Sequence, residues 1–334
     1  MAKLTVGKAI TAGLRAKLAD DPTVVLFGED IRDPYGGAFR ITRGLSAEFP
    51  DRLVNTPISE AATVGLATGM ALRGLRPVVE MMFGDFIALA ADQLINHAAK
   101  FSWMYNGAAA VPLVVRAPMG GRRGYGPTHS QSLERMLLST PGLRIVAPTP
   151  RQDAAALVAA AIDDPNPVIF IEGKLLYAME QSTASEAYDI ALTRPPYPVA
   201  VLNNAAGERA NVTVVTYGPM LPVVEQAMTA AFHQDEVTCE IVAPSEIGPL
   251  DTARIGESVT RTGRLIVAEE GPRSWGWAAE VVARVVERWG DRLAARPVRV
   301  AGRDLPLPTS RSLEDHILPG AGDVRAAVEA VMLQ

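Results

Sequence analysis

The chain has 334 residues, of which 48% are hydrophobic and 21% charged, and its formal net charge is −5. This composition supports sizeable buried cores and argues against nucleic-acid binding, because no basic cluster exceeds the pair Arg122-Arg123. Cys239 is the only cysteine, so no internal disulfide can form and we expect a cytoplasmic location. No apolar run reaches the ~18 residues of a membrane-spanning helix, so we expect neither membrane association nor a signal peptide.

Strand-like and helix-like segments alternate along the first half of the chain. The expected strands are 24–27, 76–82, 111–117, 143–147 and 168–172. The expected helices are 5–19, one that opens at Glu60, 85–103 and 151–162. Alternation of this kind predicts an α/β fold with a mostly parallel sheet.

The alternation lapses between about residues 173 and 210, where the proline-rich run 194–198 indicates a linker. A second α/β unit follows, with expected strands 212–216, 237–242, 264–268 and 298–300 and helices 220–232, 252–262, 277–289 and 322–332. We therefore expect a first domain over 1–190, a linker over 191–210 and a second domain over 211–334.

The stretch from 55 to 86 contains the most informative carboxylate. Ser59 can cap the helix that follows, and Glu60 stands in the first turn, where negative charge is favourable. Gly65 and Gly69 each cost about 1 kcal/mol in a helix interior, so we expect something to pack closely on that face. Glu60 is either an ordinary capping carboxylate or a carboxylate in a dry pocket, where burial raises a carboxyl pKa and suits it to acid–base chemistry.

Among the four histidines, His129 occupies the position most typical of function. It ends the glycine-rich loop 118–131, although a plain surface loop would give the same pattern. His97 shares a helix with Asp92 and is expected to pack or pair structurally. One cysteine and scattered histidines give no zinc spacing, and the nucleotide-binding glycine motifs and the G-x-S-x-G elbow are absent. The turn 163–167 is either an ordinary connection or a cage for a hard cation.

Motifs spread over the whole chain resemble one known family. They include Gly28-Glu29-Asp30, Tyr35-Gly36-Gly37, Thr56-Pro57-Ile58-Ser59-Glu60, Asn96-His97-Ala98-Ala99-Lys100, His129-Ser130-Gln131, Pro249-Leu250-Asp251 and Leu313-Glu314. In this order they resemble the β subunit of 2-oxo acid dehydrogenase E1 components, the thiamine-diphosphate-dependent family of pyruvate, branched-chain 2-oxo acid and acetoin dehydrogenases.

This resemblance implies a transketolase-like pyrimidine-binding domain followed by a transketolase C-terminal domain. It also implies decarboxylation of a 2-oxo acid and transfer of the acyl unit to lipoamide. Glu60 matches the glutamate that bonds the aminopyrimidine ring of the cofactor, and His129 matches a histidine that aids substrate binding, proton movement or acyl transfer. The remaining matches are Glu29, Ile58, Met82 and Phe86 around the pyrimidine, and Leu113, Ala161, Asp164 and Asn166 at a potassium site built mainly from backbone oxygens.

The chain lacks the G-D-G…N segment with which the family binds magnesium and the diphosphate. The resemblance therefore implies an α subunit that carries this half of the site, in an α2β2 assembly.

Two other interpretations remain open. One is a transketolase-like two-component enzyme that transfers a two-carbon ketol or acyl unit to a carrier protein. The other is a non-catalytic scaffold, which the presence of both Glu60 and His129 disfavours. Departures from the family pattern, such as Thr309 in place of an aromatic residue and Tyr125 in the glycine-rich loop, leave the substrate and docking to a lipoyl acyltransferase undetermined.

Overall fold

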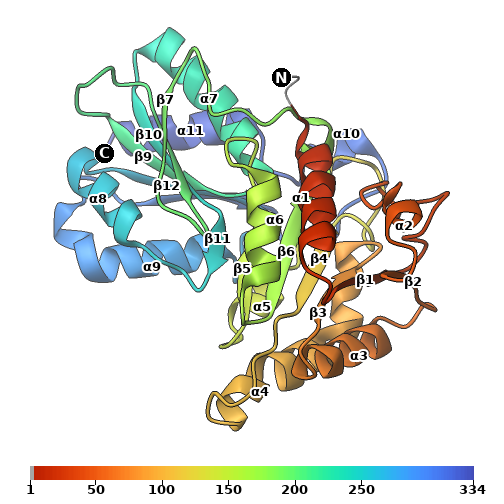
Figure 1. Cartoon of the computed structure of the whole chain (residues 1–334). Coiled ribbons are helices and arrows are strands. Elements are labelled where there is room, and N and C mark those ends of the chain that lie inside the picture. Colours follow the sequence, from red (N-terminus) through yellow and green to blue (C-terminus); the bar gives the residue numbers. More distant parts are fainter. Residues whose placement is uncertain (1–3) are drawn as a thin grey trace.

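A computed structural model describes residues 4–334, and within them the chain forms two sheets flanked by helices (Figure 1). One sheet has seven strands in the order β11-β5-β6-β4-β3-β1-β2, and the other has six in the order β13-β12-β9-β10-β8-β7. The expected α/β architecture with two mostly parallel sheets is confirmed.

The first sheet is parallel at every pairing except one. Its strands are β1 (Val24–Gly28), β2 (Leu53–Asn55), β3 (Arg76–Glu80), β4 (Val114–Met119), β5 (Arg144–Val146), β6 (Val168–Gly173) and β11 (Glu246–Gly248). The exception is β11, which comes from the second half of the chain and pairs antiparallel with β5.

Alternate residues of these strands face opposite sides, because the side-chain period of a strand is two. Leu26 and Val78 pack with α1 (Val6–Asp20) and α6 (Ala154–Asp163). Phe27 and Val79 face the other side and pack with α3 (Glu60–Leu72).

The second sheet combines parallel strands with an antiparallel hairpin. Its strands are β7 (Asp189–Leu192), β8 (Val199–Asn203), β9 (Val212–Thr216), β10 (Cys239–Pro244), β12 (Leu265–Pro272) and β13 (Val298–Gly302). Its helices are α7 (Met220–Asp235), α8 (Ala253–Thr262), α9 (Trp277–Trp289) and α11 (Ala321–Met332). Apolar residues of α8, α9 and β12 pack in the same core as β3 and β4, so the two sheets share a continuous apolar interior.

Three sequence-based expectations differ from the structure. The expected linker 191–210 contains the end of β7 and all of β8, which pair with each other and with β10. The expected helix 85–103 is divided into a 3-10 segment (Gly84–Ala90), a π-helix (Gln93–Ala98) and α4 (Ala99–Met104). The helix expected from residue 151 begins at Ala154, because the Asp153 carboxylate accepts hydrogen bonds from the first-turn amides.

The remaining helical segments are short connections. They are α2 (Leu45–Glu48), α5 (Arg135–Leu138), α10 (Arg311–Glu314) and the 3-10 turns Leu176–Ala178 and Gly290–Arg292. Among residues 4–334, no helix combines the length and apolarity needed to span a bilayer.

Candidate active site

Residues distant in the sequence meet at the carboxyl edge of the first sheet. Glu29 follows β1 directly, Met82 follows β3, and the β2 strand leads into Glu60 at the start of α3. The loop that ends at His129 leaves the same edge after β4. In open parallel α/β sheets, ligands bind outside this edge of the sheet, so the fold gathers four of the expected site residues where a ligand site is expected.

Glu60 is the first residue of α3 and only 8% exposed. Its carboxylate lies near that of Glu29, because the Glu60 charge contributes to raising the pKa of Glu29, after burial and ahead of Asp30. The expectation that Ser59 caps the helix is only half met. Ser59 occupies the N-cap position, but its side chain makes no capping hydrogen bond.

The two glycines of α3 behave differently. A Cβ at Gly65 would lie 3.0 Å from Oε1 of Gln93, so the expected close packing is confirmed there. A Cβ at Gly69 would have nothing within 4 Å, and Gly69 is exposed. The chain itself therefore leaves this part of the helix face open.

The expected apolar wall residues are incompletely covered by the rest of the chain. Ile58 is 82% exposed, whereas Met82 and Phe86 are half-buried. Met82 borders a cavity of about 330 Å³ whose other lining residues are Asp30, Pro34, Tyr35, Gly37, Ala38, Arg40 and Arg43. Neither Glu29 nor Glu60 is among these residues, so the cavity does not include the two carboxylates.

His129 is held between aromatic rings. Its ring centroid lies 4.7 Å from that of Phe83 and 5.2 Å from that of Phe86, and both contacts are edge-to-face. Its Nδ1 atom lies 2.9 Å from the Thr128 hydroxyl. The structure thus brings His129 and Phe86 together, so the histidine and an expected wall residue belong to one site.

Sequence reasoning missed two residues of this site. Phe83 contacts both His129 and Phe86. Lys174 is 1% exposed, and its ammonium donates a hydrogen bond to the main-chain carbonyl of His129. A lysine directly after the apolar strand 168–173 was the available signal, because that position lies at the carboxyl edge of the sheet.

The residues of the expected potassium site lie at the opposite, amino edge of the sheet. Leu113 precedes β4 and its carbonyl accepts from the Val168 amide, while Asp164 and Asn166 lie between α6 and β6. The Asp164 carboxylate accepts from the Asn166 side chain at 2.9 Å and pairs with Arg144 at 3.1 Å. Because protein groups already use this carboxylate, a cation here would depend on backbone oxygens.

Within residues 4–334, no three acidic, histidine or cysteine side chains converge in a way that could hold an ion.

Two family descriptions match the chain in sequence. "Transketolase, pyrimidine binding domain" matches residues 2–180, and "Transketolase, C-terminal domain" matches residues 204–324. A split-gene transketolase, described as an inactive β4 tetramer, superposes with a TM-score of 0.76 over 99% of both chains. That protein is 21% identical, so it supports the fold alone.

Several curated proteins are similar over nearly the whole chain. The β-1 subunit of the mitochondrial pyruvate dehydrogenase E1 component of Arabidopsis thaliana is 38% identical, covering 98% of this chain and 89% of its own length. The β subunit of acetoin:2,6-dichlorophenolindophenol oxidoreductase from Cupriavidus necator is 37% identical, covering 99% of this chain and 98% of its own length. The β subunit of 3-methyl-2-oxobutanoate dehydrogenase from Mycobacterium tuberculosis is 37% identical, covering 99% of this chain and 92% of its own length.

The motifs, the two-sheet fold and relatives of three substrate types agree. The chain belongs to the β subunits of the thiamine-diphosphate-dependent 2-oxo acid dehydrogenase E1 components.

Proposed function

We propose that this chain, with an α subunit, decarboxylates a 2-oxo acid and passes the acyl unit to lipoamide, using Glu60 and His129 as its catalytic residues. The observation that carries the proposal is the buried Glu60 carboxylate, which lies beside Glu29 at the carboxyl edge of the sheet. A buried carboxylate at this edge can exchange a proton with a bound group.

The residues at this edge fit the pyrimidine half of thiamine diphosphate. A heteroaromatic ring needs a proton partner on its edge and apolar contacts on its faces. Glu60 supplies the first, and Ile58, Met82 and Phe86 supply the second. When bound, the cofactor supplies the electron sink that decarboxylation requires.

Each residue then has a distinct role. Glu60 holds the proton exchanged with a pyrimidine nitrogen, and Glu29 keeps a second carboxyl group within its electrostatic reach. The apolar side chains orient the ring and exclude water. His129, fixed between Phe83 and Phe86, binds the substrate and moves a proton during acyl transfer.

We propose that an α subunit in an α2β2 assembly covers this site and holds Mg²⁺ and the diphosphate. The support is the absence of a G-D-G segment and the open face around Glu60. Ile58 is 82% exposed, Leu66 56% and Leu89 61%, and Gly69 has room for a close neighbour. Leu66 on α3 and Leu89 on the neighbouring segment Gly84–Ala90 belong to elements that pack together, and exposed apolar surface of this kind is typical of subunit contacts.

Three finer points are also proposals. A potassium ion at Leu113, Ala161, Asp164 and Asn166 is supported by the positions of Leu113, Asp164 and Asn166 just before the paired strands β4 and β6, with Ala161 in the last turn of α6. A cytoplasmic location is supported by the single, buried Cys239. A division into two domains is supported by the change of sheet between β6 and β7, which places the boundary before β7 and the segment 191–210 in the second domain.

The substrate is tested with the assembled enzyme. We expect release of CO₂ from pyruvate, a branched-chain 2-oxo acid or both, with reduction of added lipoamide. Decarboxylation of none of these acids by an assembled, cofactor-loaded complex would contradict the proposal. Transfer of a ketol unit from a ketose phosphate would instead support the two-component transketolase alternative.

A further inference from the structure

A buried lysine lies directly beneath the active-site histidine. Lys174 is the first residue after β6 and is 1% exposed, although lysine is among the residues least often buried. Burying an ammonium group is costly unless hydrogen bonds and charges compensate it. Its position therefore requires a reason in the surrounding contacts.

The contacts of Lys174 converge on His129. The ammonium donates to the main-chain carbonyl of His129, and it lies 5.3 Å from the Phe83 ring and 5.4 Å from the Tyr125 ring. Phe83 in turn contacts both the Tyr125 ring, at 5.6 Å, and the His129 ring, at 4.7 Å. One charged group thus touches the histidine backbone and the aromatic side chain that supports the imidazole.

The loop 118–131, which carries His129, is also held by hydrogen bonds to carboxylates from three other elements. The Asp85 carboxylate accepts from the Gln131 amide at 3.0 Å. The Glu270 carboxylate, on β12, accepts from the Gly121 amide at 2.9 Å. The Glu314 carboxylate, on α10, accepts from the Gly124 amide at 3.1 Å. The amides of this loop therefore donate to carboxylates, while the buried Lys174 ammonium donates to one of its carbonyls.

The charges facing Lys174 determine its protonation. Asp85, Glu270 and Glu314 favour the ammonium form, whereas Arg123 opposes it. Burial is the largest influence and lowers the pKa of Lys174 to about 8. The ammonium form is consequently the main form at neutral pH and is lost under mildly alkaline conditions.

We propose that Lys174 is a positioning residue for the reaction, which fixes the His129 backbone and the Phe83 ring so that the imidazole keeps its place at the site. The proposal rests on the role proposed for His129. An error of about 1 Å in such a group costs on the order of 100-fold in rate.

The test compares Lys174→Met with Lys174→Arg in the assembled enzyme. We expect kcat of Lys174→Met to fall roughly 10- to 100-fold with little change in KM, because binding contacts remain while the imidazole is misplaced. Lys174→Arg keeps the charge and should restore most of kcat. Lys8→Met, which removes an exposed lysine on α1, is the matched control and should match the wild type.

A pH profile separates positioning from a general structural role. We expect wild-type kcat to decline above about pH 8 as Lys174 loses its proton, and the Lys174→Met profile to lack this alkaline decline. An unchanged kcat and an unchanged alkaline limb in Lys174→Met would overturn the proposal. Equal losses in cofactor binding, subunit assembly and kcat would also overturn it, because the lysine would then be structural.

The rate at which His129 is chemically modified gives a readout that does not depend on turnover. Diethyl pyrocarbonate modifies accessible imidazoles, and the His129→Asn variant gives the background from the other three histidines. We expect His129 of Lys174→Met to react several-fold faster than in the wild type, because the loop is released; an equal rate would contradict the proposal. If His129→Asn retains normal kcat, the proposed function is wrong. If His129→Asn lowers kcat but Lys174→Met does not, only the positioning role of Lys174 is rejected.

Discussion

The charge of Glu60 helps to hold the pKa of Glu29 above its usual value, so these two carboxyl groups lie within electrostatic reach of each other. Burial is the larger cause, and Asp30 adds a smaller contribution. A nearby like charge disfavours the ionised form of a carboxyl group, as burial does. This pairing makes the carboxyl edge of the first sheet suitable for proton exchange with a heteroaromatic ring.

We expect Glu60→Gln to lower kcat of the assembled enzyme by roughly 10²–10⁴, the usual scale for a lost acid–base group. Steady-state assays of CO₂ release measure the effect, and size-exclusion chromatography checks that the subunits still assemble. Glu208→Gln, in an exposed turn, is the control. Near-normal turnover of Glu60→Gln would remove this residue from its proposed role.

The same substitution should lower the pKa of Glu29, because it removes one of the negative charges that raise it. A pH titration of the glutamate carboxyl signals by ¹³C NMR measures this shift. Assignment of the Glu29 signal follows from its loss in Glu29→Gln. An unchanged titration would mean that the two groups do not interact.

The isolated chain should bind thiamine diphosphate weakly even with Mg²⁺ present, because it lacks the G-D-G segment that would hold the metal ion and the diphosphate. Isothermal titration calorimetry on the chain with and without the α subunit measures the difference. Tight binding by the chain alone would contradict the split site. Binding that appears only on mixing would support it.

Two glycine substitutions distinguish an open helix face from a packed one. Gly69→Ala should stabilise the isolated chain by up to about 1 kcal/mol, because alanine favours a helix and the added Cβ meets nothing within 4 Å. It should also weaken assembly if the α subunit covers this face. Gly13→Ala is the comparison, since its Cβ would lie 2.5 Å from Val158 and should cost about 1–3 kcal/mol. Urea unfolding measures the change in stability, and analytical ultracentrifugation measures the change in assembly. If Gly69→Ala destabilised the isolated chain, the helix face at Gly69 would not be open.

Glu269 should make the stability of the chain fall with rising pH. Its carboxylate accepts from the Trp277 and Ala278 amides at the start of α9, yet burial raises its pKa from 4.5 to about 7. Since the folded state binds the proton more tightly, this contribution is complete below pH 4.5 and is lost as the pH rises through about 7. The loss is on the order of 3 kcal/mol.

Urea unfolding of the wild type and Glu269→Gln between pH 5 and 8 checks this prediction. We expect the wild type to lose stability over this range more steeply than the variant. Other buried carboxyls, such as Glu134, act in the same direction, so the informative quantity is the difference between the two slopes. Parallel slopes would show that Glu269 titrates normally.

The sequence predicts an element correctly where its local pattern agrees with its place in the tertiary structure. The apolar strands of both sheets and the carboxylate at the start of α3 follow from hydrophobic period and helix-end chemistry. The π-helical segment at 93–98 has no local signature, because it depends on how its neighbours pack. The β7–β8 hairpin was overlooked because prolines 195, 196 and 198 between its strands suggested an irregular segment.

The candidate site could be predicted only in part, because some of its contacts join residues that are distant in the sequence. Glu60 and His129 stand in recognisable local contexts, a helix start and a glycine-rich loop. Lys174 acts through a hydrogen bond to a residue 45 positions away, and Phe83 acts through rings brought together by the sheet. Such relations become visible only when the strand order is known.

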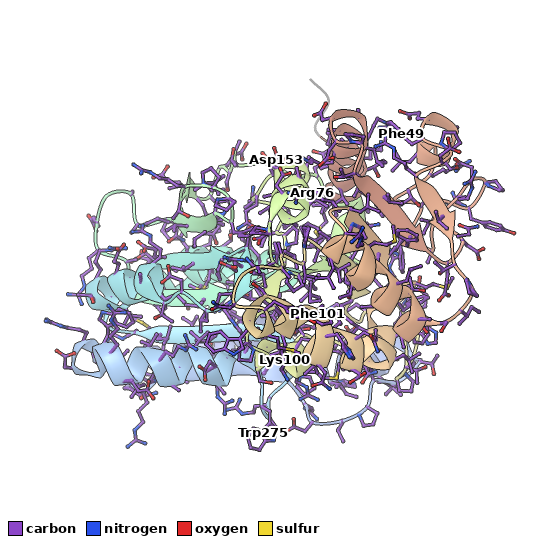
Figure 2. The ribbon with its side chains drawn as sticks, turned by 60° about the horizontal axis from the view of Figure 1, so that its bottom comes forward. Phe49, Arg76, Lys100, Phe101, Asp153 and Trp275 are labelled. Atoms are coloured by element: carbon purple, nitrogen blue, oxygen red, sulfur yellow. The ribbon has the colours of Figure 1, made fainter. Side chains whose placement is uncertain are left out.

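Large apolar side chains remain exposed elsewhere as well. Trp275 is 92% exposed, and Figure 2 shows it at the lower margin of the molecule, pointing away from the ribbon. Trp103, on α4, is 88% exposed.

The antiparallel pairing of β11 with β5 means that the second half of the polypeptide contributes an edge strand to the first sheet (Figure 1). The halves are therefore interlocked, and they cannot swing apart as a hinge without breaking a sheet. A protease cut in the exposed turn 206–209 would leave two fragments that stay together and co-purify. Opening and closing of this enzyme must consequently come from loops and from the approach of other subunits.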